Sequence, residues 1–422
     1  MNIFTSSLPL IIFDPMLSSD LVLPELQLSS RMTSHMHKVR KQIQFYACCC
    51  CQVFYLDALQ ASKPLSVTID NPRYETSYIA IIYDKGSLLI RMMESFLTPP
   101  TFRAGLGNYF SEFAFTNAVQ DDLWDVLGEA GHQTGNLSPD VSLATVMDTW
   151  TLQKGYPVVT VSFMDLCGGS VMQLKQEKFW LVGGAQSAED DYSWWIPITY
   201  ILVDSQESGF YWLNETFGSI PLLDRPVEEP YLLNLDQEGY YRVNYPEKNW
   251  NALTSMLLAE TTSLSSLTRA QLLDDSLNLA RAGLLPYSVA LNVTRYLAKE
   301  LDLVPWNSVL SQGLSYLDVR FQNSENDYPL LQNYLSSLLE LVYGTAESED
   351  LVGEKLRFLV MTWSCFLESS TCLDLAKDLW DSWKLSSHWE SEVAPEDKGW
   401  AYCNGIRQVR SSPCSSYLEQ II

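Results

Sequence analysis

The spacing of apolar residues changes twice along this chain, and the two changes limit the folds that it can adopt. In residues 86–97 the apolar side chains recur three and four positions apart, as they do on one face of an α-helix. Between residues 156 and 245 they alternate, or form short β-branched runs that end near glycines, which is typical of strands. From Pro246 onward the helical spacing returns. The sequence therefore predicts a multidomain protein with a helical region, a small β-sandwich and a second helical region.

These changes divide the 422 residues into four predicted segments. Residues 1–52 show no sustained period, and we expect this segment to be divergent or not the natural N-terminus of the parent protein. Residues 53–153 should be helical, residues 154–246 should form the β-sandwich, and residues 247–422 should form a helical-repeat region. In this last segment, successive helical patterns joined by short turns indicate a solenoid of helix pairs.

Two helices have clear boundaries in the sequence. The helix over residues 86–97 should end at the Pro-Pro pair 99–100, and Thr101 has the side chain to cap the helix that follows. The helix over residues 269–282 carries a leucine-rich stripe, and Gly283 should end it. Both patterns predict helices that bury one face and expose the other.

Net charge disfavours one broad class of partner. The chain has 27 Lys and Arg against 51 Asp and Glu, a formal charge of −24, which would repel a phosphate backbone and disfavours nucleic-acid binding. No apolar run reaches the roughly 20 residues that a spanning helix needs. Residues 8–13 make a poor signal peptide because Pro9 interrupts the run and no basic residue precedes it. We expect any targeting segments to lie outside this sequence.

The nine cysteines fall into two groups. Cys48 to Cys51 are consecutive, and neighbouring side chains cannot all converge on one metal ion, because zinc ligands are normally spaced about two to four residues apart. The others are dispersed. Among them, Cys365 and Cys372 flank a predicted helix-to-helix turn and could form a disulfide if the turn brings them together, or remain buried thiols.

Four strings of residues support a resemblance to a known family. They are Ile81-Ile82-Tyr83-Asp84-Lys85-Gly86, the run Trp-Thr-Leu-Gln-Lys-Gly-Tyr-Pro-Val-Val-Thr-Val at 150–161, Thr-Arg-Ala-Gln-Leu-Leu-Asp-Asp at 268–275, and Val-Pro-Trp at 304–306. With the order of helical piece, β-sandwich and helical array, the chain resembles zinc aminopeptidases of the aminopeptidase N type, the gluzincin family. The resemblance runs from about residue 53 to residue 410. It implies that residues 53–153 are the helical C-terminal part of a peptidase catalytic domain.

The resemblance implies one catalytic residue. In this family the tyrosine of the Tyr-x-Lys-Gly string stabilises the transition state, which gives that role to Tyr83. Without the family match, we would interpret Tyr83 as an ordinary half-buried tyrosine at the start of a helix. Lys85 and Gly86 belong to the same string and are expected to shape the start of the helix rather than touch substrate.

The zinc site of the family is not recognisable in this sequence. Such enzymes place two zinc ligands and the general base in a His-Glu-x-x-His motif, with a later glutamate as third ligand. The four histidines are His35, His37, His132 and His388, and none begins such a motif. The Gly-Ala-Met-Glu-Asn loop that holds the substrate amine in the family is also missing. We therefore nominate no metal ligand, although zinc is the family cofactor.

Several further expectations follow from the resemblance. Secreted relatives carry a disulfide in the turn that corresponds to Cys365 and Cys372. An extracellular, cell-surface or luminal location is implied, and there Asn214 and Asn292 would be N-glycosylation candidates. Peptides are the implied substrates, membrane association would need segments outside this sequence, and a homodimer stays open. From the pattern alone, the adjacent acids Asp274 and Asp275 are expected to lie on solvated faces.

The sequence leaves two function classes open, and so leaves open whether the chain is an enzyme. The first is part of a zinc aminopeptidase that removes N-terminal residues from peptides, with the chain inactive alone because the zinc site is missing. The second is a non-catalytic binding or interaction protein on the same scaffold. A truncated gene model with no independent role is a third reading, favoured mainly for the N-terminus.

Overall fold

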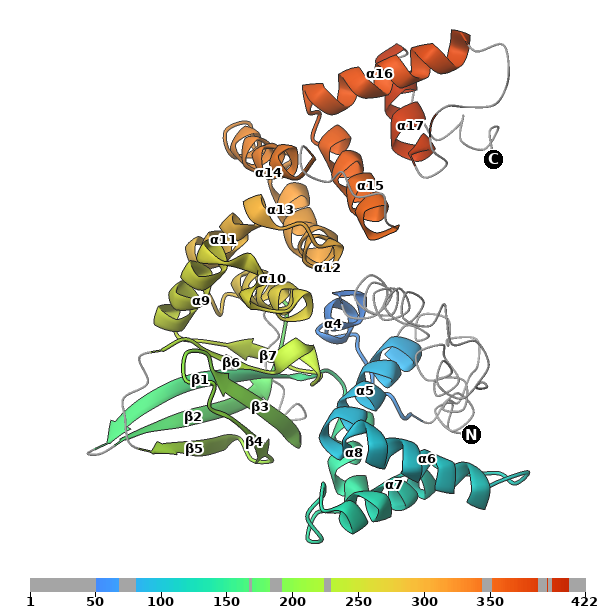
Figure 1. Cartoon of the computed structure of the whole chain (residues 1–422), viewed down its shortest axis with the longest axis vertical. Helices are drawn as coiled ribbons and strands as arrows, with labels where there is room; N and C mark the ends of the chain where they lie inside the picture. Colours follow the sequence, from blue (N-terminus) through green and yellow to red (C-terminus); the bar gives the residue numbers. More distant parts are fainter. Residues whose placement is uncertain are drawn as a thin grey trace, which may run out of the picture.

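A computed structural model describes residues 51–67, 81–166, 169–182, 192–223, 229–343, 351–385, 393 and 397–409. The elements follow the predicted order, with a helical N-terminal region, two small sheets and a helical C-terminal region (Figure 1). Figure 1 shows α5 to α8 on one side of the sheets and the later helices extending away from them. The segment 1–50, with His35, His37 and Cys48 to Cys50, lies outside the described residues, as do Cys414 and His388.

The N-terminal region consists of helices. They are α4 (Cys51–Asp57), the π-helical turn η4 (Ile81–Lys85), α5 (Gly86–Leu97), α6 (Pro99–Glu112), α7 (Gln120–Thr134) and α8 (Leu143–Thr151). The bounds of α5 are those predicted, and its buried face includes Leu89, Met92 and Met93. Gly135 ends α7 with φ +76°, in the left-handed region where glycine carries no steric penalty.

The predicted cap at Thr101 is wrong. Pro99 and Pro100 do end α5, but they also form the first turn of α6, and Thr98 is the residue that precedes this helix. Proline suits this place because the first amides of a helix have no intrahelical acceptor. Thr101 instead lies inside α6, buried, where its hydroxyl donates to Thr134 Oγ1 at 3.2 Å.

Two sheets follow α8. The first has the order β5-β2-β1-β7, from β1 (Pro157–Leu166), β2 (Gly169–Lys178), β5 (Phe217–Leu223) and β7 (Arg242–Asn244); the second has the order β4-β3-β6, from β3 (Ile196–Leu202), β4 (Ser208–Leu213) and β6 (Tyr231–Leu233). Pairing is antiparallel throughout except between β1 and β7. Buried residues of both sheets belong to one hydrophobic core, which continues into the helices on either side.

The C-terminal region is helical. It contains α9 (Glu247–Ala259), η7 (Thr261–Ser263), α10 (Ser266–Arg281), α11 (Tyr287–Thr294), η8 (Arg295–Lys299), α12 (Leu303–Ser308), η9 (Val309–Gly313), α13 (Leu314–Phe321), α14 (Asp327–Tyr343), α15 (Leu351–Phe366), α16 (Ser370–Leu385) and α17 (Lys398–Val409). A short turn, η6 (Leu235–Gln237), lies between β6 and β7 and packs against α10. Gly283, with φ +77°, follows α10 as predicted.

Helix α10 is buried on every side rather than on one stripe. All its residues from Leu267 to Ala280 are buried, including its polar ones. The reason is its position, since α10 packs against α11, α12, η6, η9 and strand β7. It is therefore one of the elements through which the helical array contacts the sheets, together with α9, whose Asn249 hydrogen-bonds to the Tyr231 backbone of β6.

Cys365 and Cys372 form a disulfide between the end of α15 and the start of α16, with Cα atoms 5.2 Å apart. They belong to a second, smaller core whose buried members are Met361, Cys365, Cys372, Ala376, Val393, Trp400, Ala401 and Tyr402. In the part of the chain that the structure describes, no helix is long and apolar enough to cross a membrane.

Candidate functional site

Tyr83 lies on the π-helical turn η4, directly before α5. Ile81 and Ile82 are buried and hold the turn against the core, whereas the Tyr83 side chain is 40% exposed. Ser87 fastens the turn to the first residues of α5, because its hydroxyl donates to the Tyr83 carbonyl at 2.7 Å. Single π-turns of this kind occur often at functional sites. The buried neighbours thus hold the turn in place, while the phenol of Tyr83 stays partly exposed to solvent.

Lys85, two residues later, is fully buried and anchors this turn. Its ammonium group lies 2.9 Å from Asp57 Oδ2, and both side chains are 0% exposed. The same Nζ donates to the Gly155 carbonyl at 3.0 Å. A buried ion pair is retained only where its remaining polar atoms are also satisfied. Lys85 therefore holds the start of α5 in place and does not face solvent.

Asp57, at the end of α4, is the centre of this cluster. Its Oδ1 accepts from the Gly155 amide at 3.0 Å and from the Ser62 hydroxyl, and its Oδ2 accepts from Tyr240 OH at 3.0 Å. Four donors on separate segments, counting Lys85, converge on this one carboxylate. The two strings that begin at Ile81 and Trp150 therefore meet at Asp57.

Gly155 is required by this approach. Its φ is +81°, and a Cβ placed on it would lie 2.9 Å from Lys178 Cε and 3.4 Å from the Asp57 carbonyl oxygen. Only glycine adopts such a φ without strain. The Gly-Tyr-Pro sequence therefore lets the chain enter β1 while its backbone stays within hydrogen-bond distance of Asp57.

A second buried cluster connects the sheets to α10. Arg242 on β7 donates from Nη1 to Asp274 Oδ2 at 2.6 Å and to Asp275 Oδ1 at 2.9 Å. Its Nε donates to Tyr156 OH at 3.2 Å, and that hydroxyl donates to the Phe54 carbonyl at 2.8 Å. One chain of hydrogen bonds therefore joins α4, the start of β1, β7 and α10.

This cluster contradicts the expectation that Asp274 and Asp275 lie on solvated faces. Both are buried, with exposed fractions of 4% and 1%. The prediction failed because α10 has no solvent face and because the arginine that pairs with both acids comes from β7, more than thirty positions earlier in the chain. Helical periodicity carries no information about such a distant partner.

Burial also changes the protonation of the cluster. It raises the pKa of Asp275 to about 7; the charge of Asp274 adds to this, whereas Arg242 opposes it. For Arg242, burial disfavours the charge, but Asp274, Tyr156 and Asp275 raise the pKa of the guanidinium above its ordinary value. Two carboxyls share one guanidinium, so a proton on Asp275 balances the charge of the cluster.

The described residues do not fit a zinc site. None of them forms a group of three or more His, Cys, Asp or Glu side chains that could hold a metal ion. His132 lies within this part of the chain, and its Nε2 is 2.9 Å from the Val141 carbonyl oxygen. We therefore assign no reaction step to a metal held by these residues.

Comparison with known proteins identifies the family. The model of the Peptidase family M1 domain matches residues 25–150, and that of the ERAP1-like C-terminal domain matches residues 230–413. Aminopeptidase N of Homo sapiens is 32% identical over an alignment of 373 residues, and the alignment covers 85% of this chain. The chain belongs to the M1 aminopeptidase family. The M1 domain match begins inside the segment 1–52 for which the sequence showed no period.

Other M1 relatives show the same extent of similarity. Aminopeptidase Ey of Gallus gallus is 32% identical over 84% of this chain, and glutamyl aminopeptidase of Sus scrofa is 32% identical over 78%. The chain covers 37% of aminopeptidase N from Homo sapiens, 37% of aminopeptidase Ey and 34% of glutamyl aminopeptidase. It thus spans little more than a third of the length of these relatives. By homology, the chain therefore belongs to a zinc-dependent family.

The glycosylation candidates differ in accessibility. Asn214 is exposed in the turn between β4 and β5. Asn292, on α11, is only half-exposed, and its amide oxygen accepts from Arg295 at 3.0 Å. Asn136, in a third Asn-x-Ser pattern, donates to the Leu97 carbonyl and to Thr101 Oγ1, both at 2.8 Å, so its amide serves the packing of α5, α6 and α7.

Sequence reasoning missed the residues that hold the surroundings of Tyr83 and the two buried clusters together, namely Asp57, Tyr240 and Arg242. Each is a polar side chain with apolar neighbours in the sequence. That combination is the one signal that could have found them, because buried ionisable groups are rare unless paired. Their partners could not be deduced, because the contacts join segments far apart in sequence.

Proposed function

We propose that this chain carries the transition-state tyrosine and the surrounding scaffold of an M1 aminopeptidase, which removes N-terminal residues from peptides in a zinc-dependent reaction. Tyr83 is the residue proposed to act in catalysis. The observation that carries the proposal is the exposed phenol of Tyr83 on a well-anchored turn. The anchor is Lys85, two residues later, which is fully buried and forms an ion pair with Asp57. We further propose that the chain alone is inactive, since its sequence contains no His-Glu-x-x-His motif.

Tyr83 suits this role chemically. Amide hydrolysis passes through a tetrahedral intermediate whose oxyanion needs a hydrogen-bond donor held in advance. A phenol on a flexible loop would lose rotational freedom in the transition state, whereas η4 is already fixed by Ile82, Ser87 and Lys85. The zinc of the family would supply Lewis-acid chemistry; Tyr83 would supply a hydrogen-bond donor from a backbone whose position is already fixed.

We propose that the elements group into domains as the sequence predicts. Residues 53–153 are the helical C-terminal part of the peptidase catalytic domain, residues 154–246 form a β-sandwich, and residues 247–422 form a helical-repeat domain. The shared core of the two sheets supports the sandwich. The succession of helices joined by short turns supports the repeat.

We also propose an extracellular, cell-surface or luminal location with peptides as substrates. The Cys365–Cys372 disulfide supports an oxidising compartment, where such bonds form and persist. In that setting Asn214 is the better glycosylation candidate because it is exposed on a turn, and Asn292 is the weaker one.

The experiment that tests the proposed function uses the native protein, isolated with an antibody against residues 53–409. Its peptides are mapped by mass spectrometry, and the same sample is assayed with an aminoacyl-p-nitroanilide, with and without a zinc chelator. We expect peptides that continue upstream of Val53 into a His-Glu-x-x-His motif, and chelator-sensitive hydrolysis. A native chain that begins near Met1 and hydrolyses nothing would contradict the proposal.

That second result would favour the alternative, a non-catalytic binding protein on the M1 scaffold. The observation in its favour is that the described residues form no metal-binding group. It predicts that zinc does not raise the melting temperature of the chain, and that peptides bind without being cleaved.

A further inference from the structure

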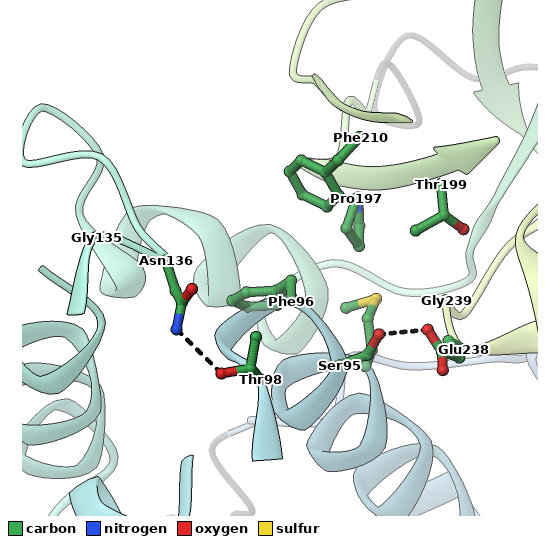
Figure 2. A pocket seen from close by; sticks show the side chains of 11 residues that line it. Ser95, Phe96, Thr98, Gly135, Asn136, Pro197, Thr199, Phe210, Glu238 and Gly239 are labelled. Carbon is green, nitrogen blue, oxygen red and sulfur yellow. Dashed lines mark hydrogen bonds between the residues drawn. The ribbon is translucent and has the colours of Figure 1, made fainter. Parts of the chain in front are cut away.

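A cavity of about 350 Å³ lies between the N-terminal helices and the two sheets (Figure 2). It is bounded by α5 and the turn into α6, by the Gly135–Asn136 turn after α7, by strands β3 and β4, and by the turn at Glu238 and Gly239. Tyr83 is not among the residues that line it. The cavity is therefore separate from the residue proposed to act in the aminopeptidase reaction.

Two aromatic rings form part of the wall. Phe96 on α5 is buried and packs edge-on against Trp212, with ring centroids 5.1 Å apart. Phe210 on β4 is 47% exposed, and Figure 2 shows it beside Pro197, on the opposite side of the cavity from Phe96. With Met92 and Pro197, these rings give the cavity an apolar part large enough for one aromatic or branched alkyl group.

The cavity has one ionisable side chain, and it is an acid. Glu238 is the only Asp, Glu, Lys, Arg or His among the eleven described lining residues. Its Oε2 accepts from the Ser95 hydroxyl at 2.5 Å, as Figure 2 shows. Within the described part of the chain no donor is paired with its Oε1. The cavity therefore has a net negative charge and an unused acceptor.

Neighbouring groups are also acceptors or hydroxyls. Asn136 lies beside Thr98, at the other end of the cavity from Glu238 (Figure 2), and its amide nitrogen donates to Leu97 O and to hydroxyls of α6 and α7. Thr199 contributes a hydroxyl from β3. An acidic cavity with these acceptors and two aromatic faces is suited to a cation.

The backbone directly before Glu238 is anchored to α5. Arg91 on α5 donates to the carbonyls of Gln237 at 2.6 Å and Asp236 at 2.9 Å. Asn234, Asp236 and Gln237 have φ of 56°, 55° and 50°, a conformation that costs non-glycine residues free energy. Strain of this kind persists where the surrounding structure over-determines it, and the result here is a Glu238 whose position is set before any ligand binds.

We propose that this cavity binds a small organic cation, an ammonium group joined to an apolar arm of aromatic size. The ammonium group donates to Glu238 Oε1 and to the Thr199 hydroxyl oxygen, which lie at the same end of the cavity (Figure 2). The arm lies between Phe96 and Phe210. The ligand joins the N-terminal helices to the sheets, because its arm contacts Phe96 of α5 and Phe210 of β4.

The test uses 2-phenylethylammonium, titrated into the full chain by isothermal calorimetry, with 2-phenylethanol as the uncharged analogue. We expect saturable binding of the cation in the millimolar range or tighter, and binding of the alcohol weaker by about tenfold or more, since a charge-assisted hydrogen bond is worth at least that ratio. No saturable binding of the cation, or equal binding of both compounds, would overturn the proposal.

Two variants locate the site. Glu238→Gln should weaken cation binding by about tenfold or more, and Glu112→Gln, at an exposed acid on α6, should leave it unchanged. Phe210→Ala removes a half-exposed ring, so it should fold normally and weaken binding of both compounds. Unchanged affinity in both Glu238→Gln and Phe210→Ala would place the ligand elsewhere and overturn the assignment.

Discussion

At the scale of single residues, Lys85 and Tyr83 lie two positions apart but have different surroundings. Lys85 is buried against Asp57 and fixes the turn, while Tyr83 is exposed beside it. The sequence expectation that Lys85 shapes the start of the helix agrees with this geometry. The role of Tyr83 in catalysis stays a prediction, because the structure shows its position but not its reaction.

Removal of the Lys85 charge should strongly destabilise the fold. Lys85→Met leaves Asp57 buried without its counter-charge, and breaking a buried pair in this way costs about 3–5 kcal/mol. Lys175→Met is the matched control, because the Lys175–Glu177 pair is half-exposed and should contribute about 1 kcal/mol or less. Urea unfolding of both variants measures the difference, and equal costs would contradict the anchoring role.

Asp275 should make stability depend on pH. Its pKa in the folded chain is about 7, above the value of about 3.9 in an unfolded chain, so between these values the folded state holds a proton that the unfolded state has released. The stability contribution is therefore present at low pH and is lost as pH rises toward and through 7. Asp275→Asn should flatten this decline.

The measurement is the free energy of unfolding in urea across that range for wild type, Asp275→Asn and the control Asp140→Asn, at an exposed acid after α7. The wild type and the control should lose stability in parallel as pH rises, and Asp275→Asn should lose less. A parallel decline in all three would show that Asp275 does not hold the proton.

At the scale of elements, the sequence predicted the helix over 86–97 and the change to strands because these depend on local spacing and turn residues. It misplaced the cap of α6 because two prolines can both end one helix and begin the next. It took α10 for a one-sided helix because burial on the other sides is imposed by β7 and the helices around it. The first error was local, and the second depended on contacts between segments far apart in the chain.

Gly155, directly before β1, is an element boundary that should be sensitive to substitution. Gly155→Ala should cost about 1 kcal/mol or more through its positive φ, and more again because Lys178 must move away from the new methyl group. Gly135→Ala is the matched control, since Gly135 also has a positive φ but nothing lies within 4 Å of its added Cβ. Thermal melting should rank Gly155→Ala below Gly135→Ala, and the reverse order would contradict the close approach to Asp57.

At the scale of the whole molecule, two cores divide the chain unevenly. The larger core runs from α4 to α15, and the smaller one joins α15, α16 and α17 around the disulfide. Asp57 and Arg242 tie the N-terminal helices, the sheets and α10 together inside the larger core. The sequence predicted this order of regions but not their connection, because each tie joins residues far apart in the chain.

The smaller core should open independently of the larger one. Cys365→Ala with Cys372→Ala removes a short disulfide loop, which should destabilise this region by about 2–3 kcal/mol. Hydrogen exchange should then increase in α15 to α17 and stay unchanged in α10. Faster exchange in α10 as well would show that the two cores unfold as one unit.

The central claim, that Tyr83 is the transition-state donor, is tested most directly in a chimera. Residues 53–409 replace the aligned part of human aminopeptidase N, and kcat is measured on an aminoacyl-p-nitroanilide. Tyr83→Phe should lower kcat by about 10²–10³-fold with little change in KM, while Tyr109→Phe on α6 leaves kcat unchanged. An active chimera whose kcat is unaffected by Tyr83→Phe would contradict the claim.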